Sequence, residues 1–196
     1  MGKGEDTKSL ILDSALKIAS VHGLDGLTIG TLATELQMSK SGLFAKFQSK
    51  ENLQIDVLKS GIELFRRNVI YPSLKTKPGI ERIITAVNSW LNWSTKAELP
   101  GGCIFLSSSL EYDDKPGIVR DFLVKSQLEW QQTLKKFFLE AVEKKEISQK
   151  ADLNQIIQEI WGIILGFHFY NRLLKDPKAK VRAKSTLNEM ITKIQI

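Results

Sequence analysis

Apolar residues recur every three or four positions through most of the chain, which is the spacing of one face of an α-helix. The first such segment begins at Lys8 and closes with His22-Gly23, a basic last turn followed by a glycine that can end a helix. Its apolar stripe consists of Leu10, Ile11, Ala15, Ile18 and Ala19. No segment alternates convincingly between apolar and polar residues, as a half-buried strand would. The pattern therefore predicts an all-α fold.

Three hydroxyl-bearing residues mark the starts of the next helices, because a side-chain oxygen can accept hydrogen bonds from the free amides of a first helical turn. Thr28 precedes a short segment that ends near residue 37, and Ser39 precedes a second short segment. Ser49 precedes a much longer segment, which we expect to extend to about residue 71.

The rest of the chain keeps the helical spacing, with one clear interruption. The run ELPGGCIF, residues 98–105, contains a proline and two glycines, which break regular structure. We expect helices at about residues 79–95, 116–145, 153–174 and 179–194, the third capped by Asp152. The whole chain should contain about nine helices.

Three helices within about 40 residues, the second and third joined by a tight turn, form the layout of a helix-turn-helix unit. In such a unit the third helix enters the major groove of DNA, and small residues near its start allow close approach to the bases. Ser41, Gly42 and Ala45 are small and lie in the expected third helix. The sequence therefore predicts a DNA-binding unit.

The charge of the chain supports this hypothesis only locally. The net charge is +6, but residues 1–60 contain seven lysines and seven acids, so overall basicity is weak evidence for nucleic-acid binding. Lys40, Lys46 and Lys50, by contrast, lie in a window from residue 37 to residue 50 that contains no carboxylate. We expect Lys46 and Lys50 to meet phosphates, with a base edge as the alternative for Lys46.

The run LTIGTLATELQMSKSGLFAKFQSKENL, preceded by ILDSALKIASVHGLDG, resembles the DNA-binding domain of the TetR/AcrR family of bacterial transcriptional repressors. The resemblance implies a helix-turn-helix domain at residues 1–49, joined by a long helix to an effector-binding and dimerisation domain at residues 50–196. Together with the chemistry above, it assigns nine residues to DNA binding: Thr28, Ser39, Lys40, Ser41, Gly42, Phe44, Ala45, Lys46 and Lys50. Among these, the resemblance implies that Lys40 lies at the entrance of the groove.

Two positions depart from the family pattern. Phe44 stands where the family usually has tyrosine, so a hydroxyl contact to phosphate is missing, and Ala45-Lys46 stands where larger aromatic residues or histidine are frequent. The operator sequence therefore cannot be inferred from relatives.

The second domain is rich in aromatic residues at helical spacing, which is typical of a core but also of a cavity wall. The resemblance implies a mostly apolar pocket for a small-molecule effector. We expect the pocket among Trp90, Trp93, Cys103, Phe105, Trp130 and Phe167. Cys103 is alternatively a small buried thiol, or a redox sensor if a cation approaches it in the fold.

Two glycines four residues apart, Gly162 and Gly166, lie on one face of the helix expected at 153–174. Glycine weakens a helix, so close approach of another helix would explain the pair. The resemblance implies dimerisation through the last two helices, and we assign the interface to Trp161, Gly162, Leu165, Gly166, Leu187, Met190 and Ile194. A close crossing within the chain is the alternative.

The resulting hypothesis is a homodimeric, ligand-responsive transcriptional regulator, most simply a repressor that binds a palindromic operator and is released by an effector. Activator action, or a helical adaptor that only dimerises, are alternatives. A hydrolase using Ser14 with Lys17, or Cys103 with His168, is a weaker one, because no glycine-rich oxyanion loop is near.

Composition excludes several other classes. One cysteine rules out an internal disulfide framework, and two histidines offer little for a metal site, so we expect neither cofactor nor metal. The N-terminus lacks a secretory pattern, and the longest apolar run, WGIILGF at 161–167, is shorter than the ~20 residues of a membrane-spanning helix. We therefore expect a cytoplasmic protein without a membrane partner.

Overall fold

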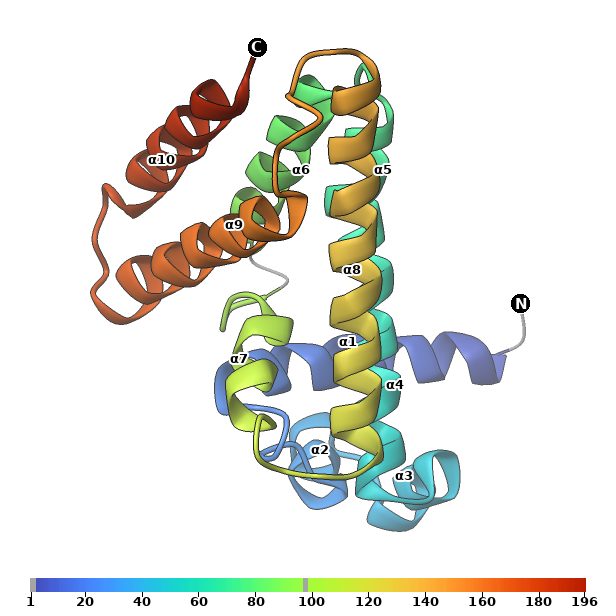
Figure 1. The fold of residues 1–196 in the computed structure, drawn as a ribbon. Helices are drawn as coiled ribbons and strands as arrows, with labels where there is room; N and C mark the ends of the chain where they lie inside the picture. The colour runs from blue at the N-terminus through green and yellow to red at the C-terminus, as the bar shows by residue number, and fades with distance from the viewer. Residues whose placement is uncertain (1–2, 97–98) are drawn as a thin grey trace. The chain divides into compact units, whose positions relative to one another are not determined.

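The computed structural model describes residues 3–96 and 99–196, with side chains from Thr7 onward (Figure 1). Its α-helices are α1 (Lys3–His22), α2 (Ile29–Leu36), α3 (Lys40–Phe47), α4 (Lys50–Phe65), α5 (Tyr71–Leu74), α6 (Ile80–Trp93), α7 (Ile104–Glu111), α8 (Ile118–Glu143), α9 (Leu153–His168) and α10 (Ala179–Ile194). Two π-helical turns, η1 (Arg66–Ile70) and η2 (Phe169–Leu173), follow α4 and α9. The described residues contain no β-strand, which confirms the all-α prediction.

The three hydroxyl caps predicted from the sequence are confirmed. The side-chain oxygens of Thr28, Ser39 and Ser49 each accept a hydrogen bond from a backbone amide at 3.0 to 3.1 Å. Asp152 caps α9 in the same way. Each cap satisfies an amide that the first turn of a helix leaves without an intrahelical partner, so these helix starts are set by the local sequence.

The long fourth helix contains an irregularity that the sequence analysis did not anticipate. After α4 the chain passes through η1 into the short helix α5, whose second residue is Pro72. Proline has no amide hydrogen and its ring clashes with the preceding turn, so a wider π-helical turn accommodates it without ending the helix.

Helix α7 was not predicted as a separate element. Its sequence, IFLSSSLE, is buried on several sides and therefore shows no single apolar stripe. The hydroxyls of Ser107 and Ser109 donate to the carbonyl oxygens of Ile104 and Phe105, a bond that replaces solvation of the serines inside a buried helix. The expected break begins at Glu98, outside the described residues, and ends where α7 starts.

The chain forms two compact units. The first unit contains residues 1–64 and 95–126, and the second contains residues 65–94 and 127–196. Helices α4 and α8 each cross the boundary along the chain. This division differs from the predicted functional boundary at residue 49, which remains a prediction.

The first unit joins the helix-turn-helix to α7. Gly61 of α4 lies so close to α7 that an added Cβ would stand 3.3 Å from Phe105 and 3.4 Å from Ile104. A Cβ at Gly101 would overlap the carbonyl group of Ser20 in α1, and the amide of Gly101 donates to the hydroxyl of Ser20 at 3.0 Å. Residues 99–111 are therefore packed tightly against α1 and α4.

In the second unit α9 and α10 lie side by side and run in opposite directions (Figure 1). The start of α6 is tied to α8 by an ion pair between Arg82 and Glu140, at 2.7 Å, and the amide of Ile80 donates to Glu146 at 2.8 Å. These bonds place the tryptophans of α6 against α8.

Candidate nucleic-acid interface

Helices α2 and α3 form the predicted helix-turn-helix. Gln37 adopts a left-handed conformation, with φ at 52°, and the amide of Met38 donates to the carbonyl of Ala33, which closes α2 within one turn. Leu32 and Leu43 are fully buried between the helices and the rest of the first unit. The opposite face of α3 is left to solvent.

That exposed face carries most of the residues assigned to DNA. Ser39, Lys40, Ser41, Phe44, Ala45 and Lys46 are exposed, while Thr28, Gly42 and Lys50 are half-buried. Phe44 is unusual, because 58% of this large apolar side chain is exposed. Among the described residues, neither Lys40 nor Lys46 forms an ion pair, so both charges are available to an anion.

Lys40 lies over the start of α2. A Cβ at Gly30 would be 3.9 Å from the Lys40 Nζ and 3.6 Å from the Thr28 hydroxyl oxygen. The ammonium group therefore lies close to the N-terminus of α2. The N-terminal end of a helix is itself positive, so the two groups repel unless an anion joins them. A phosphate oxygen is a suitable ligand for these two positive groups.

The structure gives a second explanation for glycine at position 42, besides the predicted clearance for DNA. An added Cβ would be 2.9 Å from the Ser39 hydroxyl oxygen, which accepts from the Gly42 amide. A larger residue would therefore press on the α3 cap. Clearance for DNA remains a prediction.

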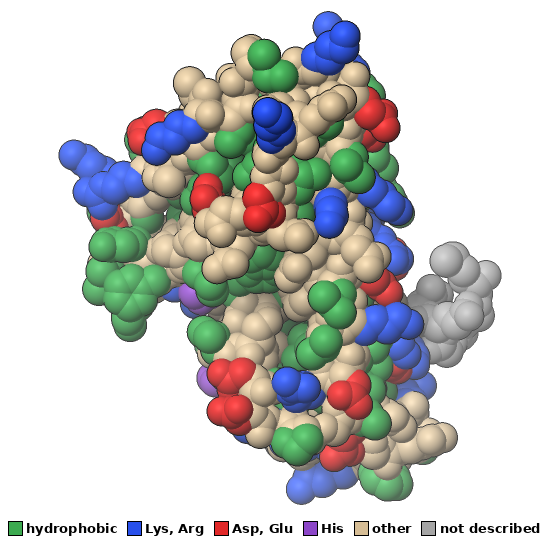
Figure 2. Space-filling model, in the orientation of Figure 1, with side chains coloured by type: hydrophobic (Ala, Val, Ile, Leu, Met, Phe, Trp, Pro, Cys, Tyr) green, Lys and Arg blue, Asp and Glu red, His purple; other side chains and the backbone are tan. Residues whose placement is uncertain are grey.

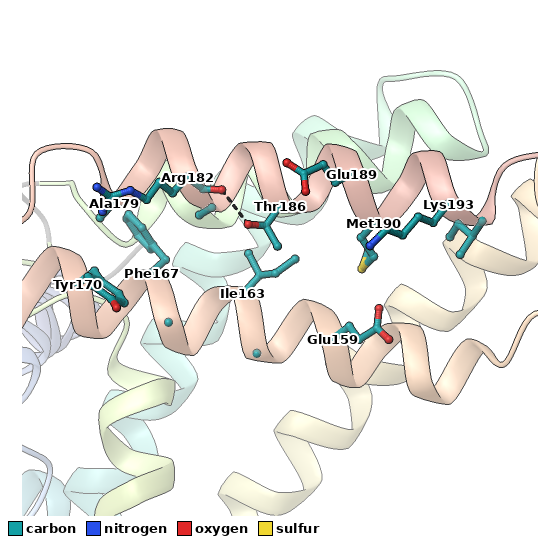
Figure 3. A pocket seen from close by; sticks show the side chains of 14 residues that line it. Glu159, Ile163, Phe167, Tyr170, Ala179, Arg182, Thr186, Glu189, Met190 and Lys193 are labelled. Carbon is teal, nitrogen blue, oxygen red and sulfur yellow. Dashed lines mark hydrogen bonds between the residues drawn. The ribbon is translucent and has the colours of Figure 1, made fainter.

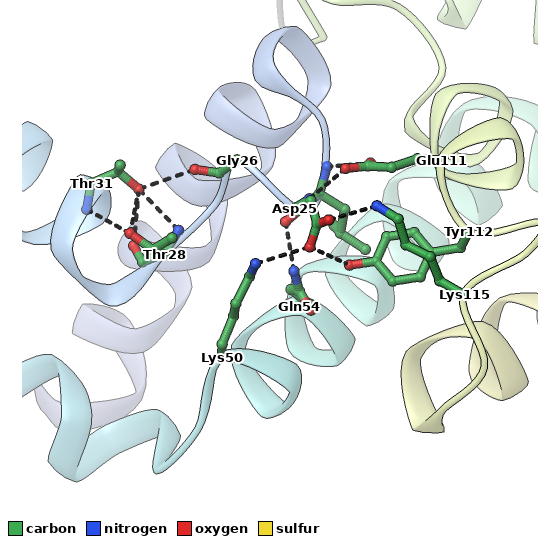
Figure 4. Close-up of polar contacts among 10 residues, drawn as sticks. Asp25, Gly26, Thr28, Thr31, Lys50, Gln54, Glu111, Tyr112 and Lys115 are labelled. Atoms are coloured by element: carbon green, nitrogen blue, oxygen red, sulfur yellow. Dashed lines mark hydrogen bonds and ion pairs between the residues drawn. The ribbon is translucent and has the colours of Figure 1, made fainter.

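Lys50 differs from the other two lysines. Its Nζ contacts Asp25 Oδ1 at 2.9 Å, so its charge is partly neutralised within the chain (Figure 4). Asp25 Oδ2 also contacts the Nζ of Lys115 at 2.6 Å, and the Tyr112 hydroxyl donates to Asp25 Oδ1 at 3.4 Å. We call Asp25, Lys50, Glu111, Tyr112 and Lys115 the Asp25 cluster.

The electrostatics of the cluster follow from this arrangement. Hydrogen bonds from Lys115 and Lys50 lower the pKa of Asp25 to about 2. Burial and the neighbouring charge of Asp25 raise the pKa of Tyr112, and the hydrogen bond to Asp25 raises the pKa of Lys115. Asp25 is therefore a carboxylate at any physiological pH. Sequence reasoning missed it, because its partners in α7 and the following loop are distant in the sequence.

Three of the residues expected to bind an effector pack around one further aromatic residue, Phe65. Trp90, Trp93 and Trp130 pack around Phe65 with ring centroids 5.9, 5.2 and 4.8 Å from it, and Trp161 packs on Trp90 at 5.1 Å. We call these five residues the tryptophan cluster. The indole N–H groups of Trp90 and Trp130 are buried and reach no acceptor in the described residues.

The other expected effector residues are buried as well. Cys103 and Phe105 are buried in the first unit, while Phe167 is buried on α9. Phe65, which the sequence analysis did not single out, is central to the tryptophan cluster. No local signal distinguished it from the rest of the apolar stripe of α4.

A groove of about 840 Å³ runs between α9 and α10 (Figure 3). Gly162 and Gly166 line it, and a Cβ at either position would meet nothing within 4 Å. The described residues therefore contain no close crossing at these two glycines, which contradicts the alternative of a crossing within the chain. Met190 and Ile194 also line the groove, whereas Leu187, assigned to the interface, is fully buried inside its own unit.

Apolar side chains are also exposed at the end of α9, where Figure 2 shows a green group at the left edge. These residues are Leu165, Phe169, Tyr170, Leu173 and Leu174, each between 42% and 69% exposed. Trp161, by contrast, is tied to Trp90 of its own chain, and its place in an interface remains a prediction.

The described residues offer little support for other chemistries. No group of three or more His, Cys, Asp or Glu side chains is arranged to hold a metal ion in the described part of the chain. Within the same residues, no helix is long and apolar enough to span a membrane.

An all-helical chain with a capped helix-turn-helix and an exposed, lysine-bearing third helix belongs to the class of helix-turn-helix DNA-binding regulators. Two family models match it. The model for bacterial regulatory proteins of the tetR family matches residues 11–57, and the model for the tetracyclin repressor-like C-terminal domain matches residues 79–187. The chain belongs to the TetR family of transcriptional regulators, and neither model indicates an enzyme.

Solved structures share the fold over nearly the whole chain. A TetR transcriptional regulator from Chloroflexus aurantiacus is 22% identical with a TM-score of 0.90, covering 100% of this chain and 98% of its own. A protein described as a transcriptional regulator from Saccharomonospora viridis, crystallised with choline, is 19% identical with a TM-score of 0.82, covering 99% and 100%. AibR, solved with isovaleryl coenzyme A and operator DNA, is 19% identical with a TM-score of 0.72, covering 94% and 96%. No curated protein matches the sequence.

Proposed function

We propose that this regulator is a homodimeric repressor that binds a palindromic operator through α3 and is released by a small-molecule effector. The observation that carries the proposal is the exposed face of α3, where Lys40, Lys46 and Phe44 surround the small residues Ser41 and Ala45. Two copies related by a two-fold axis would present their α3 helices to successive major grooves, about 34 Å apart. Residues 1–49 are the DNA-binding part in this proposal, and residues 50–196 carry the effector and dimer functions.

The dimer is supported by the groove between α9 and α10. Its glycines expose helix backbone that none of the described residues covers. Its lining includes both signs of charge, with Glu159 and Glu189 beside Arg182 and Lys193. A two-fold interface brings a patch against its own copy, so a patch with both charges can complement itself. The exposed apolar residues at the end of α9 extend the same surface.

The effector site is supported by the tryptophan cluster. Burying an indole N–H without an acceptor costs about 1 to 3 kcal/mol, and Trp90 and Trp130 bury two. An effector with hydrogen-bond acceptors would satisfy these donors. Choline and isovaleryl coenzyme A, bound by two proteins of this fold, differ so much in chemistry that they do not define the effector of this chain. Binding would shift α4, which leads from the second unit into the first, and so alter the spacing of the α3 helices.

The test is selection of duplex DNA from a random pool, followed by binding measurements on the selected sequence. We expect an inverted repeat, and we expect Lys46→Met to weaken binding and lower the salt dependence by about one unit of slope, because one phosphate contact is lost. Lys59→Met is the matched control, since Lys59 is an exposed lysine of the same unit that pairs with Asp56.

The adaptor alternative makes the opposite prediction. An adaptor that only dimerises should show no salt-dependent retention on duplex DNA and no enriched repeat. Recovery of an inverted repeat whose binding is indifferent to Lys46 would also contradict the assigned role of α3.

A further inference from the structure

We propose that Asp25 competes with DNA phosphate for Lys50, and that Lys115, by sharing Asp25, determines how strongly Lys50 is held. The inference rests on the proposed function, in which the start of α4 meets the DNA backbone. It adds Asp25 as a residue that weakens DNA binding. It also adds Lys115, in the loop after α7, as a residue that reduces this effect of Asp25.

The competition follows from the chemistry of Lys50. Its ammonium lies 2.9 Å from Asp25 Oδ1, and a phosphate oxygen would require the same donor. Both side chains are well exposed, Lys50 at 38% and Asp25 at 46%, so the pair is weak enough for a phosphate to displace. DNA binding by Lys50 therefore includes the loss of a contact within the chain.

Asp25 is not free to move away from Lys50. The backbone amides of Leu24 and Asp25 donate to the two carboxylate oxygens of Glu111, both at 2.7 Å, and Gln54 of α4 donates to the Leu24 carbonyl at 2.7 Å. The turn before Asp25 is formed by Gly23, with φ at 78°, a conformation that favours glycine. The end of α7 thus holds the turn that presents the carboxylate.

Lys115 weakens the hold of Asp25 on Lys50. It contacts the second carboxylate oxygen at 2.6 Å, and its ammonium lies 5.2 Å from the centre of the Tyr112 ring (Figure 4). Two ammonium groups on one carboxylate repel each other, so each is held less strongly than it would be if it were alone on that carboxylate. Removal of Lys115 should therefore leave Lys50 more firmly paired and less available to DNA.

This arrangement links two parts of the family architecture. Glu111, Tyr112 and Lys115 lie in the segment matched by the C-terminal domain model, residues 79–187, yet they belong to the same compact unit as the helix-turn-helix. A change in the loop after α7 would reach the DNA-binding lysine through Asp25.

The experiment measures the affinity of the full-length protein for a random-sequence duplex of about 30 base pairs, because phosphate contacts do not depend on base sequence. Asp25→Asn should bind about two- to fivefold more tightly than wild type, the range expected for release of one exposed ion pair. Lys115→Met should bind about twofold more weakly, and in a Lys50→Met background each change should keep only the small effect of the altered net charge.

The Lys50→Met background separates competition from simple charge. Removing a carboxylate makes the protein less negative and would by itself favour DNA, with or without Lys50. Asp56→Asn is the matched control, because Asp56 also holds two lysines of the first unit, Lys8 at 2.7 Å and Lys59 at 3.1 Å. Its effect should be smaller than that of Asp25→Asn and equal in both backgrounds.

Two results would overturn the inference while leaving the proposed function intact. In the first, wild-type protein binds DNA but Asp25→Asn does not raise its affinity. In the second, Asp25→Asn raises the affinity equally in the Lys50→Met background. Wild-type protein that binds the duplex without salt dependence would instead remove the proposed function. Thermal unfolding of each variant identifies loss of fold, and Lys115→Met tests the same competition in the opposite direction.

Discussion

Asp25 shows how a single residue acquires its properties from distant parts of the chain. Its neighbours in the sequence, Leu24 and Gly26, are uncharged, yet Lys115 and Lys50 lower its pKa to about 2. The unfolded chain has no such partners, so its carboxyl keeps a pKa near 3.8. Folding and ionisation of Asp25 are therefore linked.

The sign of the linkage gives a prediction. Because the pKa is lower in the folded state, the stabilisation is complete above about pH 5, and it is lost progressively as the pH falls towards 2. Asp25→Asn should cost about 1 kcal/mol or less at pH 7, since solvent screens this exposed cluster. Urea unfolding at pH 7, 5, 4 and 3 should show the difference between wild type and variant shrinking. Parallel stability curves for the two proteins would contradict the linkage.

At the scale of an element, α3 combines a structural and a functional requirement at Gly42. The glycine accommodates the Ser39 cap, because a Cβ would be 2.9 Å from the hydroxyl oxygen, and it lies on the helix assigned to the major groove. A glycine in a helix costs about 1 kcal/mol relative to alanine. Either the cap or the clearance alone would explain a glycine at this position.

A pair of variants separates the two requirements. Ser39→Ala removes the cap and should destabilise the protein by about 1 kcal/mol. Adding Gly42→Ala should then cost no further stability, because the crowded hydroxyl is gone, but it should still weaken DNA binding if the groove needs the clearance. Chemical unfolding and DNA affinity are measured on the same samples. Unchanged DNA affinity on adding Gly42→Ala would leave the cap as the reason for the glycine.

At the scale of the whole molecule, the proposed dimer determines how DNA is bound. A Cβ added at Gly162 or Gly166 would meet none of the described atoms within 4 Å, so a larger side chain fits within one chain but would obstruct a second copy in the groove between α9 and α10. An operator with two half-sites is bound tightly only when two α3 helices are joined.

Gly162→Leu should therefore give a monomer that remains folded. The leucine should not unfold the monomer, because leucine favours a helix by roughly 0.8 kcal/mol over glycine. Affinity for a two-half-site duplex should fall at least tenfold, while affinity for a single half-site is unchanged. Sedimentation and DNA titration test both statements. Thr192→Leu, an exposed position of α10 outside the groove, is the control, and equal effects of the two changes would count against this interface.

Local chemistry explains why much of the fold was predictable. Thr28, Ser39, Ser49 and Asp152 each cap a helix with their own side chain, and the partner amides lie within three residues, so the signals are present in a short window of sequence. Helix α7 carried no such signal, because it is buried on several sides and rich in serine. The π-helical turn η1 was not predicted, because apolar spacing does not distinguish a wider turn before Pro72 from a regular helical turn.

The sequence by itself determined the helical class of the chain, the position of the helix-turn-helix and the exposed lysines of α3, because periodicity and caps act within a few residues. Only the tertiary structure decided that Lys50 pairs with Asp25, that Phe65 joins the tryptophans, and that Gly162 and Gly166 have open space beside them among the described residues. These facts depend on contacts between residues up to 90 positions apart, as between Asp25 and Lys115. Such contacts arise from the packing of whole helices, and no local pattern of residues records them.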